Sequence, residues 1–210
     1  MKATLFTLRR LATAIDYLRI KHSAKHRYDW SLPITISILL MLIYYFLPIK
    51  PSILKPGGII SQINSIIQIL TGFYIASLAA VATFNSDRLN KTMNGREPAS
   101  IGEENLTRRR FLCLLFSYLV TLCFILMVVG ISAPIISQNV KLLLPNYFLI
   151  IKYTALSAYT FMVSQLVVIT LLGLYYIADK IHDKTIRKNK TIRALPPEEV
   201  EDEDEEYKAI

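Results

Sequence analysis

Two uncharged stretches decide the fold: residues 56–86, PGGIISQINSIIQILTGFYIASLAAVATFNS, and residues 111–140, FLCLLFSYLVTLCFILMVVGISAPIISQNV. They run for 31 and 30 residues without Asp, Glu, Lys or Arg. A bilayer core about 30 Å thick needs roughly 20 apolar helical residues at about 1.5 Å each. The segment between them, residues 87–110, carries six basic and four acidic residues. The pattern predicts a transmembrane helical hairpin whose hinge, residues 87–110, lies in water.

Two further apolar segments extend this hairpin to four spans, at about residues 32–49, 59–84, 111–133 and 153–178. We therefore predict an all-α integral membrane protein with a four-helix transmembrane bundle over residues 31–178. Pro134 is expected to end the third span. Residues 142–151 are apolar but too short to cross a bilayer, and are expected to form an interfacial or re-entrant piece.

The composition of the chain agrees with a membrane protein. Of its 210 residues 53% are hydrophobic, and the net charge of +8 lies outside the uncharged stretches. Anionic lipid headgroups are therefore the first expected partner. The basic residues are split among three segments, so we expect no direct nucleic-acid binding. Cys113 and Cys123 lie ten residues apart in one span and are expected to be reduced core residues.

The segments outside the bundle are strongly charged. Residues 1–30 form a basic segment with an amphipathic helix, which lies either on the inner leaflet or on the protein's own cytoplasmic portion. Residues 179–194 are expected to form a basic juxtamembrane helix, and residues 195–210 a disordered acidic tail that either docks a partner or solubilises the chain. The apolar face of the first helix comprises Leu5, Leu8, Leu11, Ala12, Ile15 and Leu18. The acidic tail residues are Glu198, Glu199, Glu201, Asp202, Glu203, Asp204, Glu205 and Glu206.

The distribution of basic residues predicts the orientation. Seven precede the first span, two lie in the first loop, six in the hinge, two in the third loop and seven after the last span. By the positive-inside rule both termini and the hinge are cytoplasmic. Thr107 is the expected N-cap of the third span. Arg108, Arg109 and Arg110 are expected to anchor that end at the headgroups, with phosphate binding as the alternative.

The second span carries small and polar residues at steps of three and four. Helices in lipid associate through close packing of small residues and through side-chain hydrogen bonds. The stripe predicts a pore or an oligomer seam, or else packing within the protein's own bundle. Its central members are Ser65, Gln68, Gly72, Ala76 and Ala80.

The sequence carries little chemistry that would support catalysis. No span contains an ionisable side chain other than Cys or Tyr, and no phosphate-binding, metal-binding or hydrolase motif is present. We therefore expect no enzyme and no cofactor. Two functions remain: a scaffold or sensor that oligomerises and recruits a cytoplasmic protein, and a small oligomeric channel or membrane-permeabilising effector.

One run of residues resembles known proteins. Ala82-Thr83-Phe84-Asn85, the polar hinge and the run LTRRRFLCLLFSYL at residues 106–119 resemble bacterial four-span proteins. Among these, the membrane subunits of Kiwa-type phage-defence systems are the nearest. The resemblance covers about a fifth of the chain, is topological and carries over no site residue. It implies an oligomeric inner-membrane protein with a cytoplasmic, nucleic-acid-binding partner encoded beside it.

Overall fold

The structure, a computed structural model, describes residues 12–20, 25–49, 51–55, 57–84, 87–92, 100–101 and 104–177. The chain divides into two compact units, Met1–Gly173 and Leu174–Ile210. Of the second unit only residues 174–177 are described, and there the rings of Tyr175 and Tyr176 meet edge to face at 5.9 Å. The expected basic helix 179–194 and acidic tail 195–210 lie outside the described residues.

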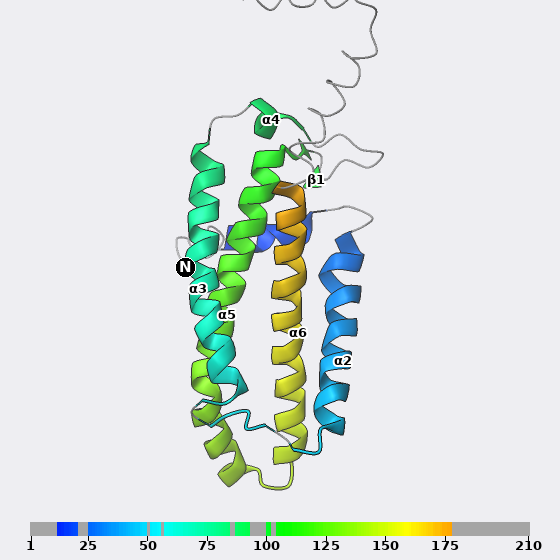
Figure 1. Cartoon of the computed structure of the whole chain (residues 1–210), viewed down its shortest axis with the longest axis vertical. Helices are drawn as coiled ribbons and strands as arrows, with labels where there is room; N and C mark the ends of the chain where they lie inside the picture. The colour runs from blue at the N-terminus through cyan, green and yellow to red at the C-terminus, as the bar shows by residue number, and fades with distance from the viewer. Residues whose placement is uncertain are drawn as a thin grey trace, which may run out of the picture. The chain divides into compact units, whose positions relative to one another are not determined.

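Four long helices dominate the first unit (Figure 1). They are α2 (Leu32–Phe46), α3 (Ile59–Thr83), α5 (Arg108–Leu143) and α6 (Phe148–Tyr175). A π-helical turn, η2 (Arg27–Ser31), leads directly into α2 and extends the first apolar helix to 20 residues. All four are long and apolar enough to cross a membrane. The prediction of four helices with the length and composition of membrane spans is therefore confirmed.

The helices define two ends of the bundle (Figure 1). At the loop end, α2 connects to α3 and α5 connects to α6. At the hinge end, α3 connects to α5 through the short helix α4 (Asp87–Asn90) and the strands β1 (Ser100–Ile101) and β2 (Glu104–Asn105). The two strands pair antiparallel, with Ser100 opposite Asn105. Apart from this pairing and an isolated antiparallel bridge between Thr92 and Thr107, the regular secondary structure of the described chain is helical, as predicted.

The antiparallel pair of α3 and α5 forms the closest helix packing in the structure. The buried residues of α3 follow one another at alternating steps of four and three residues. This spacing places them on one side of the helix, which faces α5. These residues are Ile60, Asn64, Ile67, Thr71 and Tyr74. Across the interface, Thr71 lies 4.0 Å from the sulfur of Met127, and the rings of Tyr74 and Phe116 lie 6.4 Å apart.

The third span does not end at Pro134, and that prediction is wrong. The helix α5 continues through Pro134 to Leu143. Pro134 has no N–H to donate to the Gly130 carbonyl, yet proline is tolerated inside apolar helices of this kind. Two nearby serines donate to other carbonyls of the same helix. Ser137 donates a hydrogen bond from Oγ to the Pro134 carbonyl at 2.9 Å, and Ser132 donates to the Val128 carbonyl at 2.7 Å.

Residues 142–151 also differ from the expected interfacial or re-entrant piece. α5 ends at Leu143, residues 144–147 form a turn, and α6 begins at Phe148. The turn contains Pro145 and Asn146, which favour chain reversal. The apolar run is therefore the end of one helix and the start of the next.

The N-terminal segment packs on the bundle where it is described. The 3₁₀ helix η1 (Ala12–Arg19) contacts α5, and the ring of Tyr17 stacks on that of Tyr118 at 5.1 Å. Tyr17 is fully buried, whereas Leu18, assigned to the apolar face, is 39% exposed. This described part of the segment therefore packs on the helix α5, which leaves both placements of the predicted amphipathic helix as predictions. Residues 1–11 lie outside the described part.

A buried ion pair fixes the start of the first apolar helix. Asp29 is 2% exposed and pairs with Lys25 at 2.8 Å. It also accepts a hydrogen bond from the Tyr17 hydroxyl at 3.1 Å, and its backbone carbonyl accepts one from Gln165 Nε2 at 3.2 Å. These contacts join η1, η2 and α6. Because a buried charge is costly unless it is paired and hydrogen-bonded, the cluster orders all three elements together.

Candidate functional site

The stripe on α3 lies on the exposed side of the helix. All five central members, Ser65, Gln68, Gly72, Ala76 and Ala80, are exposed. A Cβ built on Gly72 would meet no described atom within 4 Å. We call these five residues the outer stripe. Within the described chain, α3 packs on α5 through a different face, so the stripe is not used for packing inside this bundle.

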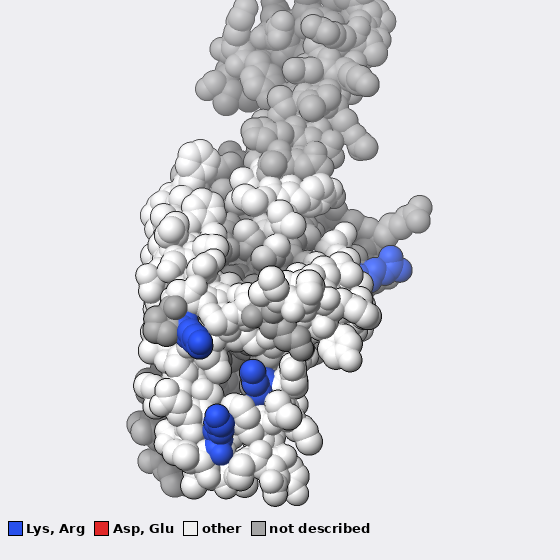
Figure 2. All heavy atoms as spheres, turned by 60° about the horizontal axis from the view of Figure 1, so that its bottom comes forward, with Lys and Arg blue, Asp and Glu red and all other residues white. Residues whose placement is uncertain are grey.

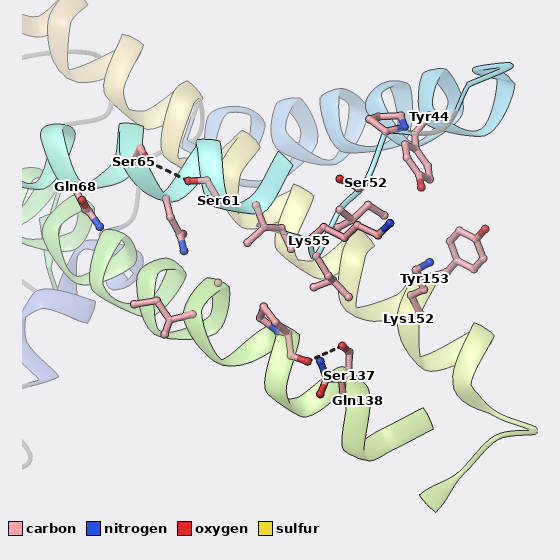
Figure 3. A pocket seen from close by; sticks show the side chains of 18 residues that line it. Tyr44, Ser52, Lys55, Ser61, Ser65, Gln68, Ser137, Gln138, Lys152 and Tyr153 are labelled. Atoms are coloured by element: carbon pink, nitrogen blue, oxygen red, sulfur yellow. Dashed lines mark hydrogen bonds between the residues drawn. The ribbon is translucent and has the colours of Figure 1, made fainter. Parts of the chain in front are cut away.

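A large hollow lies at the loop end, between α3, α5 and the start of α6 (Figure 3). Its volume is about 950 Å³. Two members of the outer stripe, Ser65 and Gln68, form part of its wall. Its polar lining is contributed chiefly by Ser61, Asn64, Ser65, Gln68, Ser137 and Gln138. We call this space the loop-end hollow.

Among the described residues that line the loop-end hollow, the charged side chains are all basic. Lys55, from the loop after α2, and Lys152, near the start of α6, both line it. The sequence has no Asp or Glu from residue 30 to 86 or from 105 to 178, so the charged residues of the α2–α3 loop and of the adjoining ends of α5 and α6 are all lysines. Figure 2 shows this end with blue side chains and no red among the described atoms of the visible face. The local field at this end is therefore positive.

The loop 51–58 holds Lys55 at the rim of the hollow. The backbone N–H groups of Gly58, Ile59 and Ile60 donate to the carbonyls of Lys55, Ser52 and Ile53 at 2.8, 3.1 and 3.3 Å. The loop therefore satisfies the first free N–H groups of α3. A Cβ on Gly58 would lie 2.5 Å from the Ser52 carbonyl oxygen, so only glycine permits this close approach.

Asn64 lies in the wall of the hollow, where three helices meet. Its side chain is 9% exposed, and Tyr159 of α6 donates from its hydroxyl to Asn64 Oδ1 at 3.5 Å. Gly130 of α5 faces the same amide, and a Cβ at that position would collide with it. The amide nitrogen of Asn64 donates to no described residue, although it belongs to the lining of the hollow.

Two narrower apolar clefts adjoin the loop-end hollow. One, of about 240 Å³, lies between α5 and α6, and the other, of about 260 Å³, lies between α2, α3 and α6. Ile53 and Ile60 belong to the lining of both clefts and of the hollow, so the three spaces are neighbours. The linings of the clefts are mostly aliphatic, with Ala155 and Leu156 in the first and Leu40 and Val163 in the second.

The three consecutive arginines have different surroundings at the hinge end. Arg109 donates from Nη2 to the Phe84 carbonyl at 2.7 Å, and Arg110 is exposed. Arg108 is partly buried. Thr107 accepts a hydrogen bond at Oγ1 from the Arg110 backbone N–H at 3.3 Å, so the predicted N-cap is confirmed. The acidic residues from Glu198 to Glu206 lie outside the described part of the chain.

Sequence reasoning missed three of the residues that build the hollow. Lys55 and Lys152 were counted only toward orientation, and Asn64 was not singled out. The available signals were three side-chain amides, Gln62, Asn64 and Gln68, inside one apolar span, and an absence of acidic residues on both short loops. Among the described residues no group of three His, Cys, Asp or Glu side chains could hold a metal ion. Cys113 and Cys123 are both free thiols.

No protein-family model, curated protein or solved structure matches the chain. The arrangement of the residues must therefore carry the functional argument alone. It offers a positively charged polar hollow at one end of the bundle, and a small-residue face that the bundle leaves uncovered.

Proposed function

We propose that this chain is a non-enzymatic multipass protein of the bacterial inner membrane that forms homo-oligomers and recruits a cytoplasmic partner, as a scaffold or sensor. The exposure of the outer stripe carries the proposal. In lipid, small residues allow helix backbones to approach closely, and polar side chains are stabilised by partners on another helix. Gly72, Ala76 and Ala80 supply the close approach, and Ser65 and Gln68 supply the polar contacts.

The recruiting role is supported by the charged segments at the hinge end. The positive-inside rule assigns the hinge and both termini to the cytoplasm. The acidic tail from Glu198 to Glu206 would bind a basic surface on a partner. The likeness to membrane subunits of Kiwa-type systems suggests a partner that binds nucleic acid and a role in antiphage defence.

A small oligomeric channel or membrane-permeabilising effector is the second candidate. The observation that favours it is the meeting of the outer stripe and the loop-end hollow at Ser65 and Gln68. If the stripes of several subunits surrounded an axis, their polar residues would line it and Lys55 would stand near one mouth. Such a pore would favour anions.

Mass measurement of the full-length protein in detergent tests the oligomer. Replacing Ala76 with Leu adds bulk to the stripe and should lower the oligomer mass, because the helices can no longer approach. The matched control is Ala158→Leu, the same change at an exposed position of α6. If wild type and Ala76→Leu have the same mass, the stripe is not a seam.

Two further measurements separate the scaffold from the channel. A tagged pull-down from cells should recover a cytoplasmic protein if the chain is a scaffold. In that case the purified protein should produce no ionic conductance in a planar bilayer. Reproducible conductance that Ala76→Leu abolishes and Ala158→Leu preserves would instead establish the channel.

A further inference from the structure

The loop-end hollow has an excess of positive charge that no described residue in its lining neutralises. Lys152 is half-buried and Lys55 is exposed at the rim, and no Asp or Glu lies among the residues that line the space. Two cations beside one cavity repel each other, and an anion between them would remove that repulsion. Lysine is a common ligand of phosphate groups, which it binds as a point charge.

The hollow also contains amide donors with no acceptor in the described protein. The side-chain amides of Asn64, Gln68 and Gln138 donate to no described residue. Asn64 is the most constrained of the three, since Gly130 and Tyr159 hold its amide in place. These amides open onto the hollow, where the oxygen atoms of a bound ligand would accept hydrogen bonds from them. The site therefore suits a ligand with several oxygen acceptors.

The neighbouring clefts add an apolar component to the site. Both adjoin the hollow across Ile53 and Ile60, and one also shares Lys152 with it. A small soluble anion would use none of this apolar surface. A molecule with a charged head and hydrocarbon chains would place its head in the hollow and its chains in the clefts.

We infer that the loop-end hollow binds the phosphate-bearing headgroup of an anionic membrane lipid, with Lys55 and Lys152 as its cationic ligands and the two apolar clefts receiving its chains. Backbone hydrogen bonds from Gly58, Ile59 and Ile60 to residues 52–55 position the backbone of Lys55 at the rim before the lipid arrives. The site lies within one protomer, so it does not depend on the proposed oligomer. As part of a sensor, it would give the protein a means to report on the lipid composition around it.

Short-chain lipids test the site on the full-length protein in neutral detergent. Native mass spectrometry would compare dioctanoyl phosphatidylglycerol with dioctanoyl phosphatidylcholine, which carries the same phosphate but no net charge. We expect the anionic lipid to bind about tenfold more tightly, because the choline cation of phosphatidylcholine is repelled by the two lysines and offsets their attraction for the phosphate. Lys55→Gln combined with Lys152→Gln should abolish this preference. Lys141→Gln removes a lysine from the same end that does not line the hollow, and should preserve it.

Two further arms identify the source of the phosphate group. Inorganic phosphate should fail to displace the lipid at comparable concentrations, because it leaves the clefts empty. Ala155→Trp partly fills the cleft between α5 and α6, and should weaken lipid binding severalfold while any binding of inorganic phosphate is unchanged. If phosphate competes equally and Ala155→Trp has no effect, the ligand is a soluble anion and the lipid assignment is wrong.

The remaining outcome overturns the site itself. Retention of the full preference for phosphatidylglycerol by the double lysine variant would show that the lipid binds elsewhere. Melting curves of the variants confirm that each is folded before binding is compared. The same mass spectra report the number of protomers. A monomer that binds the lipid would contradict the proposed oligomer and would still support the lipid site.

Discussion

Arg109, in the first turn of α5, donates from Nη2 to the backbone carbonyl of Phe84 at the end of α3, at a distance of 2.7 Å. A cation is unfavourable at the N-terminus of its own helix but favourable at the C-terminus of another. The antiparallel pair places these two ends side by side. Arg109 therefore compensates for its unfavourable position in α5 by capping α3.

We predict that Arg109→Gln destabilises the bundle by about 1–2 kcal/mol, because the Phe84 carbonyl loses a charged hydrogen-bond donor. Thermal melting of the full-length protein in detergent measures this. Arg110→Gln is the control, since Arg110 is exposed and should contribute less. Equal melting temperatures for the two variants would show that the contact with Phe84 has no structural role.

Gly130 and Gly72 should respond in opposite ways to alanine. A Cβ at Gly130 collides with the Asn64 side chain, whereas one at Gly72 meets no described atom within 4 Å. Gly130→Ala should cost about 1–3 kcal/mol, typical of an overpacked site. Gly72→Ala should be neutral or stabilising by up to about 1 kcal/mol, since alanine favours helix. Thermal melting measures both, and a stable Gly130→Ala variant would contradict the close packing around Asn64.

Two acidic residues of the N-terminal region should differ strongly in importance. Asp29 and Lys25 form a buried pair, whereas the pair of Asp16 and Arg19 is largely exposed. Breaking a buried pair leaves a charge without compensation, and Asp29→Asn should cost about 3 kcal/mol. Asp16→Asn should cost less than about 1 kcal/mol, as is usual for surface pairs. The melting temperatures of the two variants check this. A lower melting temperature for Asp16→Asn than for Asp29→Asn would show that the buried pair does not stabilise the fold.

The fold was largely predictable from local patterns, and the hollow was not. Uncharged runs mark the helices directly, and Thr107 ahead of three arginines marks a helix start. Pro134 was misread because its neighbours, not proline alone, decide whether a helix continues. The hollow depends on Lys55 of the α2–α3 loop and Lys152 of α6 lining one space, and on the fit of Asn64 against Gly130. Such long-range pairings leave no periodic signal in a single sequence.

Reporter fusions test the orientation that the proposed function requires. We predict cytoplasmic activity for reporters placed at the C-terminus and between Asn94 and Gly95, because positive charge concentrates on those segments. A reporter in the first loop, after Lys50, should be active only on the opposite side. A periplasmic signal from either of the first two fusions would overturn the topology and move the loop-end hollow to the cytoplasmic leaflet.

The acidic tail should be required for partner binding and dispensable for insertion. Truncation after Ala194 removes the eight acidic residues between Glu198 and Glu206 and leaves every apolar helix intact. Co-purification of the cytoplasmic partner should then fall while membrane insertion is unchanged. A full-length control in which these acids are replaced by Gln and Asn keeps the length of the tail and removes its negative charge. It therefore distinguishes the effect of the charge from the effect of losing the segment.

Salt dependence distinguishes a charged contact from a steric role of the tail. The Debye length is about 8 Å at physiological ionic strength and about 3 Å at 1 M, so an electrostatic contact weakens steeply over this range. The amount of partner recovered with the intact protein should fall as the salt concentration rises. The variant with the neutralised tail should recover little partner at every salt concentration. If truncation, neutralisation and salt all leave recovery unchanged, the tail only solubilises the chain, and the partner must bind the hinge, residues 87–110.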